Sequence, residues 1–368
     1  MLRDQDIALA WVVRYYRAHS RDVPLFQLSN GRAIAYLTKP QWHFPLLKHD
    51  DVNFVCSTER SSAEVDHRGM LLRRLQGQRI WDGEILCLRH GILEGSDGLR
   101  IDLCRGTYFQ YATISGELTR EAVACARSPR KKAVVRDTVA HSIGDLQSGK
   151  PRAQLLGFAV AFLYATSAGW QVLIQRRSPA TGVAGDLNAV VPAYVVEPVE
   201  ADGKVMVAPF QDFLREASEE LYAANHHVDP HPLRADWYLE LEDVQRLRTL
   251  RESGKLEFEI VGLGFDALTG ELNVAAVAVL NDKDVARSEL RLMQINWEVT
   301  GVEAFDIESD EVEALINSST MYPTSAFALW CAREWLRART RAGESATSSS
   351  DSATGHASGD DFRSAAAA

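Results

Sequence analysis

Cysteine is scarce in this sequence, and its spacing excludes the usual cysteine-based sites. There are five, an odd number, with no CxxC pair among them: Cys56, Cys87, Cys104, Cys125 and Cys331. A disulfide framework needs an even, regularly spaced set, and a zinc site needs closely spaced ligand pairs. We therefore expect free thiols and a reducing compartment, which favours the cytoplasm.

Long apolar runs are also lacking. The longest extends from Leu155 to Ala165, well short of the roughly 20 residues that a membrane-spanning helix needs. The first residues include acids where a signal peptide is basic and then apolar. These features predict a soluble cytoplasmic protein without a membrane partner.

Positive charge is in the minority. The 368 residues include 40 Lys and Arg against 50 Asp and Glu, which gives a net charge of −10. Because nucleic-acid phosphates bind to basic surfaces, this balance argues against nucleic acid as the partner. A phosphorylated small molecule in a local basic pocket stays possible, and the sequence does not define the oligomeric state.

The composition is that of a globular chain, with 46% hydrophobic residues, and the length exceeds one typical domain. We predict an N-terminal α+β region at 1–126, a basic linker at 127–152, a second domain at 153–340 and a disordered tail at 341–368. The tail is rich in Ser, Ala and Gly and has little to bury. The basic run Arg127–Lys132 is either a solvated surface segment, which we favour, or an anion-binding patch.

Apolar periodicity predicts the elements of the N-terminal region. Apolar residues recur at helical spacing from Ile7 to Tyr16, and a short helix is expected at Thr119–Ala126. The runs typical of strands are Ala33–Leu37, Val52–Cys56, Ile80–Arg89, Leu99–Cys104 and Tyr108–Thr113.

The second half predicts strands mixed with helices, and therefore an α/β or α+β architecture. Helices are expected at Phe210–Ala224 and from about Thr324 to Arg337. The expected strands are Leu156–Thr166, Trp170–Gln175, Leu187–Val196, Leu256–Phe265 and Leu272–Leu280.

The helix expected at 210–224 carries the most informative pattern. Asp212, Glu216, Glu219 and Glu220 share one face within roughly 100° of arc, beside an apolar face. Like charges at this spacing destabilise a helix by about 0.2–0.5 kcal/mol per pair, so the face invites a divalent cation, Mg²⁺ or Mn²⁺. The alternative is a solvated acidic face steadied by an ion pair between Arg215 and Glu219, and the helix pattern alone favours this alternative.

The run Arg215–Glu220, which reads R-E-A-S-E-E, resembles the R-E-x-x-E-E core of the Nudix box, the signature helix of the Nudix hydrolases. The order of elements is similar as well, because the strand Leu173–Ser178 and the segment Asn188–Ala193 precede this helix. The resemblance extends from about Gln154 to Arg337. It implies that the second domain is a Nudix-like α/β/α sandwich.

The resemblance also implies roles for the charged residues. Glu216, Glu219 and Glu220 match the positions that bind Mg²⁺ (or Mn²⁺) and serve catalysis, and Arg215 matches the arginine that steadies the helix. Arg176 or Arg177, at the end of the preceding strand, is a candidate to bind a substrate phosphate through two parallel hydrogen bonds. The alternative for these two arginines is a pair of solvent-exposed charges at a strand end.

The activity implied is Mg²⁺-dependent hydrolysis of a nucleoside diphosphate linked to another group, with a nucleotide-type small molecule as substrate. The sequence departs from the box, since Ala201 and Val207 stand where it has a glycine and a glutamate, and Tyr222 replaces another glycine. These departures lead to a hypothesis of a different class. In it, the protein is a ligand-sensing or regulatory module that keeps the Nudix-like shape without the chemistry.

Overall fold

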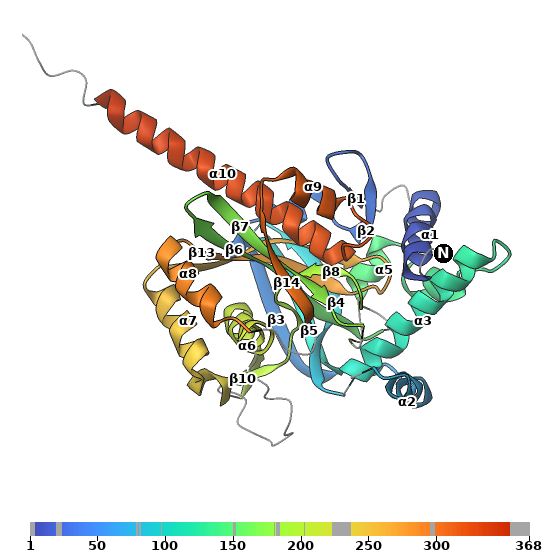
Figure 1. The fold of residues 1–368 in the computed structure, drawn as a ribbon. Helices are drawn as coiled ribbons and strands as arrows, with labels where there is room; N and C mark the ends of the chain where they lie inside the picture. Colours follow the sequence, from blue (N-terminus) through green and yellow to red (C-terminus); the bar gives the residue numbers. More distant parts are fainter. Residues whose placement is uncertain are drawn as a thin grey trace, which may run out of the picture.

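The computed structural model describes residues 4–19, 24–78, 80, 82–96, 98–149, 152–179, 181, 185–201, 203–222, 237–294 and 299–353. A large mixed sheet forms the centre of the molecule, and helices surround it (Figure 1). The predicted class, a mixed α+β fold, is confirmed. Among the described residues, no helix is both long enough and apolar enough to cross a membrane.

The elements of the first half include helices within the predicted linker. They are α1 (Asp4–His19), β1 (Leu25–Gln27), β2 (Ala33–Leu37), β3 (Val52–Arg60), α2 (His67–Leu75), β4 (Glu84–Gly95), β5 (Gly98–Thr107), α3 (Tyr108–Arg127), α4 (Val134–Val139) and α5 (Ile143–Ser148). The basic side chains at 127 and 130–132 are exposed, as expected for a solvated segment.

The strand predicted at Tyr108–Thr113 is wrong, because these residues form the first turns of α3. A capping box starts the helix there: the hydroxyl of Thr107 accepts from the amide of Gln110, and the Gln110 side chain accepts from the Thr107 amide at 2.9 Å. These two bonds satisfy amides that the first turn of a helix leaves without partners. Local capping therefore outweighs the strand-like composition of the segment.

The second half contains most of the sheet. Its elements are β6 (Gln154–Thr166), β7 (Gly169–Arg177), β8 (Asn188–Val190), β9 (Ala193–Val195), β10 (Val199–Ala201), β11 (Lys204–Met206), α6 (Pro209–Leu221), α7 (Glu242–Glu252), β12 (Leu256–Asp266), β13 (Leu272–Leu280), α8 (Lys283–Leu292), β14 (Val299–Asp306), α9 (Asp310–Ile316) and α10 (Pro323–Ala353). Helix α10 extends beyond the predicted end at Arg337. Residues 354–368 of the predicted tail lie outside the described residues.

The sheet joins the two halves of the chain. Its main order is β1-β2-β12-β13-β6-β4-β5-β3, and β7, β8, β9 and β14 attach beside β6. Strand β6 runs parallel to β13 and antiparallel to β4, β7 and β9. Because β2 pairs with β12 and β4 pairs with β6, strands of the N-terminal region and of the second domain form one hydrogen-bonded sheet.

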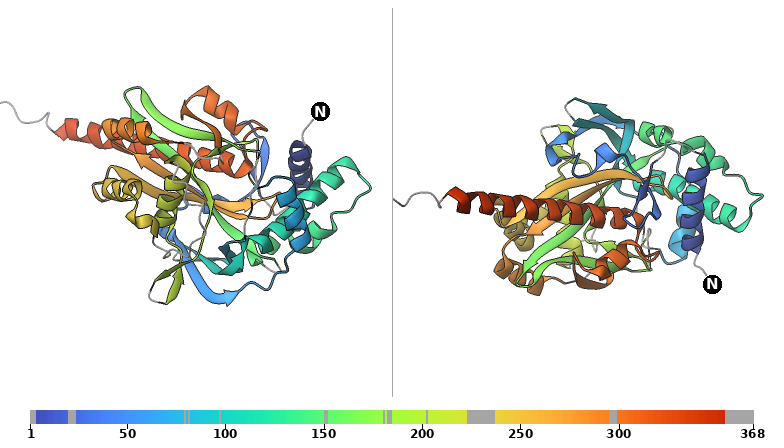
Figure 2. Two further views of the ribbon diagram at one scale, coloured as in Figure 1. Left: turned by 60° about the horizontal axis from the view of Figure 1, so that its bottom comes forward. Right: turned by 90° about the horizontal axis from the view of Figure 1, so that it is seen from above.

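Helices cover both faces of the central strands. Every residue of β13 is buried, which is typical of a strand with helices on each side. Along β6, Ala161 and Leu163 belong to a core cluster with Phe327 of α10, whereas Val160 and Phe162 belong to another with α6, α7 and α8. Figure 2 shows α10 lying along one face of the sheet. The second half is therefore a three-layer sandwich of helix, sheet and helix.

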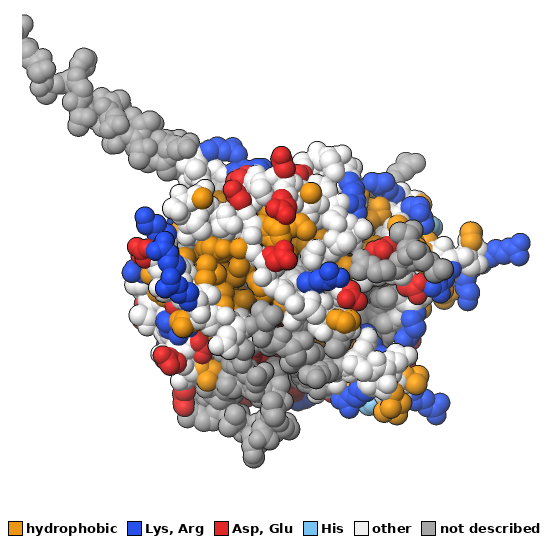
Figure 3. Space-filling view, in the orientation of Figure 1, with side chains coloured by type: hydrophobic (Ala, Val, Ile, Leu, Met, Phe, Trp, Pro, Cys, Tyr) orange, Lys and Arg blue, Asp and Glu red, His pale blue; other side chains and the backbone are white. Residues whose placement is uncertain are grey.

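Charged side chains of both signs are spread over the face shown in Figure 3. Lys and Arg side chains form a row at the left edge of this view, near α8, and elsewhere they stand at separate places among Asp and Glu.

Candidate functional site

Helix α6 is buried on more than its apolar side. It begins with Pro209, whose missing amide and fixed φ suit the first turn of a helix. The acidic face is buried as well, since Asp212 is 2% exposed, Glu219 6% and Glu220 3%. The alternative of a solvated acidic face is therefore wrong, and the charge of this face must be balanced within the protein.

Arg215 balances this charge. Its guanidinium lies 2.8 Å from the carboxylate of Glu216, 3.7 Å from that of Glu219 and 3.6 Å from that of Glu197. Burial opposes the charge of Arg215, but the three carboxylates together raise its pKa above the ordinary value. The predicted pair between Arg215 and Glu219 is thus present, inside the protein instead of on its surface.

The carboxylates of α6 remain under electrostatic strain in spite of Arg215. Burial raises the pKa of Glu216 well above its usual range, and repulsion from Glu219 and Glu220 adds to this effect, while Arg215 opposes it. Glu220 accepts hydrogen bonds from the side-chain amide of Gln175 and the backbone amide of Ala193, both at 3.4 Å. Such clustering of perturbed acids is typical of functional sites.

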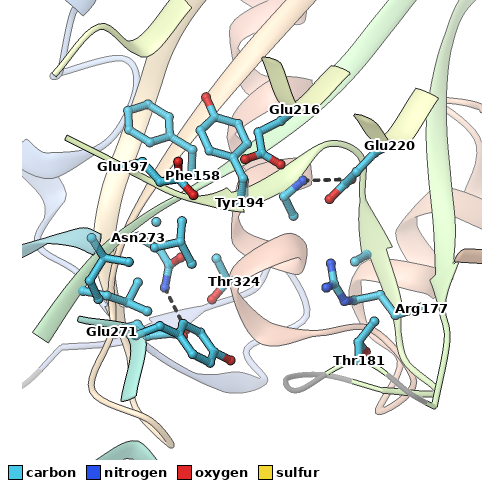
Figure 4. A pocket seen from close by; sticks show the side chains of 18 of the residues that line it. Phe158, Arg177, Thr181, Tyr194, Glu197, Glu216, Glu220, Glu271, Asn273 and Thr324 are labelled. Carbon is cyan, nitrogen blue, oxygen red and sulfur yellow. Dashed lines mark hydrogen bonds between the residues drawn. The ribbon is translucent and has the colours of Figure 1, made fainter. Parts of the chain in front are cut away.

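A cavity of about 220 Å³ opens beside α6 (Figure 4). It brings together five of the residues expected from the sequence, which are Arg177, Arg215, Glu216, Glu219 and Glu220. Figure 4 shows Arg177 beside Thr181 on one side of the cavity, with Glu220 above them. Residues from β7, α6 and the loop after β7 therefore meet at one site.

Arg176 is the exception among the predicted site residues. Successive side chains of a strand point to opposite faces, and Arg177 lines the cavity while Arg176 is exposed. Arg176 lines a separate pocket with Glu303 and Phe305 of the neighbouring strand β14. Of the two arginines, only Arg177 is placed to contact a ligand in the cavity.

The N-terminal region supplies part of the cavity wall. Tyr108 and Tyr111, from the first turns of α3, and Ile85 of β4 line it together with Phe158 and Tyr194 of the second domain. The rings of Phe158 and Tyr194 are stacked, with centroids 5.5 Å apart and planes 5° from parallel. These aromatic side chains offer a surface that suits a flat ring in the ligand.

A second group of polar residues faces the cavity, and the sequence analysis missed it. The carboxylate of Glu271 accepts a hydrogen bond from the Tyr111 hydroxyl, one of 3.1 Å from the Tyr322 hydroxyl and one of 3.4 Å from the Asn273 amide. Burial and the nearby Asp266 raise the pKa of Glu271 to about 6. Figure 4 shows Glu271 and Asn273 across the cavity from Arg177 and Glu220.

The hairpin between β12 and β13 positions Glu271. The Asp266 carboxylate accepts hydrogen bonds from the backbone amides of Leu268 at 2.7 Å and Thr269 at 3.0 Å, and Gly270 adopts a φ of 78° that favours glycine. These hydrogen bonds stabilise the turn that places Glu271 at its exit. One feature of the sequence could have indicated this part of the site: two polar residues, Glu271 and Asn273, stand at the start of an otherwise apolar strand.

The donor chemistry of the cavity suits Mg²⁺, but the arrangement of the donors does not. Glu216, Glu219 and Glu220 supply the carboxylate oxygens that hard divalent cations prefer. Within the described part of the chain, however, no three His, Cys, Asp or Glu side chains come together as metal ligands. Arg215 pairs with Glu216 and Glu219 instead. As they are arranged, these residues do not fit the metal centre that the resemblance implies.

No protein-family model matches this sequence, and neither does any curated protein. Among solved structures, the chain is similar to a Nudix hydrolase from M. smegmatis, with 14% sequence identity and a TM-score of 0.29. The match covers 50% of this chain and 87% of that chain. Similarity at this level establishes neither the fold nor the activity, and the geometry of the cavity must carry the functional conclusion.

Proposed function

We propose that the protein binds a nucleotide-type small molecule in the cavity beside α6, and that it acts as a ligand-binding or sensing protein. One observation carries the proposal. A single cavity receives a cationic side chain, Arg177, a set of aromatic walls, and the acceptor groups of Glu271 and Asn273. A nucleotide carries the three matching chemistries: an anionic phosphate, a flat ring and hydrogen-bond donors.

In this proposal, Arg177 binds the anionic end of the ligand. Arginine presents a planar set of N–H donors that matches phosphate oxygens. The ligand's ring lies against the aromatic wall, where stacking and burial both contribute to the binding free energy. Arg215 keeps the charge of α6 balanced, so that the helix forms a fixed wall before the ligand arrives.

The second candidate is Mg²⁺-dependent hydrolysis of a nucleoside diphosphate linked to another group. It is favoured by the fact that Glu216, Glu219 and Glu220 all line the same cavity as Arg177. It requires the pairs between Arg215 and two of these glutamates to give way to a metal ion. We place binding without catalysis first because those pairs are already formed in a buried setting.

The test combines binding with product analysis. Purified protein is titrated calorimetrically with nucleotide sugars, dinucleotides and nucleoside diphosphates, once with Mg²⁺ and once with a chelator, and each mixture is then analysed for phosphate-containing products. The proposal predicts that at least one compound binds in both conditions without being cleaved. Metal-dependent cleavage, reduced by orders of magnitude in Glu216→Gln, Glu219→Gln and Glu220→Gln alike, would establish the hydrolase instead.

A further inference from the structure

The Glu271 end of the cavity has unused hydrogen-bond acceptors. An ionised carboxylate has about four acceptor positions. In Glu271, three of them are filled by the hydroxyls of Tyr111 and Tyr322 and by the side-chain amide of Asn273. The Tyr111 hydroxyl is committed as a donor to this carboxylate, and the Tyr322 hydroxyl contacts both Glu271 and Asp266. The position that is left belongs to the oxygen that Tyr111 contacts, because the other oxygen already accepts two hydrogen bonds.

Asn273 adds a second acceptor. Its Nδ2 faces Glu271, since a carboxylate accepts and does not donate, so its Oδ1 points away from Glu271. There it meets Gly157 of β6: a Cβ built on this glycine would lie 2.8 Å from Asn273 Oδ1. Gly157 also lines the cavity, and no donor in the described residues reaches this oxygen. The absence of a side chain at Gly157 keeps the space in front of the amide oxygen open.

We propose that Glu271 and Asn273 form the specificity end of the cavity and receive the amino-bearing edge of a heteroaromatic ring, the base of the nucleotide-type ligand. This inference rests on the proposed function and adds to it the orientation of the ligand, with its base at Glu271 and its phosphate at Arg177. A ring edge with carbonyl oxygens only would face two acceptors and be repelled. A ring with an exocyclic amino group supplies the donors that both oxygens lack.

Burial of Glu271 and Asn273 strengthens the preference for a ring that carries an amino group. Glu271 is 6% exposed and Asn273 7%, so water replaces a missing ligand donor poorly at this end. A hydrogen bond to a charged group is worth about 1.5–3 kcal/mol, which corresponds to a difference of about tenfold to a hundredfold in affinity. Burial raises the pKa of Glu271 to about 6, which leaves the carboxylate ionised at neutral pH.

The test removes the amino group and the carboxylate in turn. Affinities of ADP, CDP and GDP are compared by calorimetry with that of purine riboside 5′-diphosphate, whose ring has no N–H donor. In the wild type, the tightest of the three is expected to bind at least about tenfold better than the comparison compound. In Glu271→Gln this preference should fall below about threefold. Asn273→Ala, which keeps the carboxylate, should weaken the preference in the same direction.

Glu289→Gln is the matched control. Glu289 is a buried carboxylate that accepts from the Tyr222 hydroxyl and from Arg246, but it does not line the cavity. Its variant should keep the wild-type preference. Two results would overturn the inference while leaving nucleotide binding intact. One is an unchanged preference in both Glu271→Gln and Asn273→Ala. The other is that Glu271→Gln loses affinity for ADP but not for 2′,3′-dideoxy-ADP, which would mean that Glu271 contacts the ribose hydroxyls.

A probe without phosphate separates this inference from the proposed function. Adenosine carries an amino-bearing heteroaromatic ring that is neutral near pH 7, and it has no phosphate for Arg177 to bind. If none of the nucleotides binds but adenosine binds to the wild type and not to Glu271→Gln, the proposed function fails and this inference stands. If neither nucleotides nor adenosine bind, both are overturned.

Discussion

Arg215 and Glu216, neighbours in the chain, form a buried ion pair with 2.8 Å between guanidinium nitrogen and carboxylate oxygen. Consecutive residues of a helix do not normally face each other, since about 100° separates them around the axis. The long arginine side chain spans that angle and also reaches Glu219, on the next turn, and Glu197, which precedes β10. One cation thereby balances three carboxylates at the wall of the cavity.

Replacing this cation should destabilise the fold strongly. We expect Arg215→Met to lower the free energy of unfolding at pH 8 by about 3–5 kcal/mol, because carboxylates would be left buried without a counter-charge. The loss should shrink as the pH falls, since protonation of Glu216 removes the charge to be balanced. Denaturant unfolding at several pH values measures it.

Arg100→Met is the control for that experiment. Arg100 pairs with Asp102 at 2.8 Å but is itself 54% exposed, and surface pairs contribute at most about 1 kcal/mol. If Arg215→Met costs no more than Arg100→Met at pH 8, the buried cluster does not depend on Arg215 and our description of α6 is incorrect.

Asp212 should make the protein less stable at high pH. Burial raises the pKa of this carboxyl to about 7, and one of its oxygens has no hydrogen-bond partner. The folded state thus holds the proton more tightly than the unfolded state. Its contribution to stability is full below about pH 4 and is lost as the pH rises through about 7.

Asp212→Asn removes this titration. At pH 8 the variant should exceed the wild type by up to about 4 kcal/mol in the free energy of unfolding, and the two should converge near pH 4. The exposed Asp284 provides the comparison, and Asp284→Asn should change little at either pH. A variant that is less stable than the wild type at pH 8 would mean that the charge of Asp212 is needed.

Binding of adenosine should weaken in acid. The groups that face Glu271 are Asp266, Tyr111, Tyr322 and Asn273, and the net effect of burial and of Asp266 is a Glu271 pKa of about 6. Protonation removes the charge of Glu271 and turns one of its oxygens into a donor, so it weakens the hydrogen bond to an amino group. Affinity should therefore fall by up to about tenfold per pH unit below that value. Titrations between pH 5 and 8 measure this slope. Glu271→Gln should show no slope, and an equal slope in both proteins would assign the titration to another group.

The second half should not fold without the first. Strand β2 pairs with β12, β4 pairs with β6, and α3 contributes Tyr108 and Tyr111 to the cavity. A chain that begins at residue 128 would leave the edges of β12 and β6 unpaired and apolar core surface exposed. We expect such a chain to lack a cooperative thermal transition. A fragment with wild-type stability and nucleotide binding would make the N-terminal region an independent module.

The elements that the sequence predicts best are those whose signal is local and continuous. The expected strand Leu272–Leu280 agrees with β13 residue for residue, because an unbroken apolar run between turn residues permits few alternatives. Tyr108–Thr113 has a strand-like composition too, but a capping box formed by its neighbours makes it helical. The sequence shows both the strand-like composition and the residues of the capping box, but it does not show which of the two signals determines the structure.

In the candidate site, too, the features that depend on local sequence were predicted and those that depend on distant contacts were not. The register of α6 is a property of the helix alone, so the sequence placed Glu216, Glu219 and Glu220 on one face. Whether that face meets water depends on the layers packed around α6, and these come from distant parts of the chain. Glu271 gave little signal, because its role arises from Tyr111, which is 160 positions away along the chain. Non-local contacts of this kind become visible only in the folded structure.

Titration with Mn²⁺ tests most directly whether Arg215, in place of a metal ion, balances the acidic helix. Wild type and Glu219→Gln are titrated without nucleotide, and bound Mn²⁺ is followed through paramagnetic relaxation of water. We predict weak binding, with a Kd of about a millimolar or more and no difference between the two proteins, because the carboxylates are already paired. Micromolar binding to the wild type that is lost in Glu219→Gln would contradict this account and establish a metal site on α6.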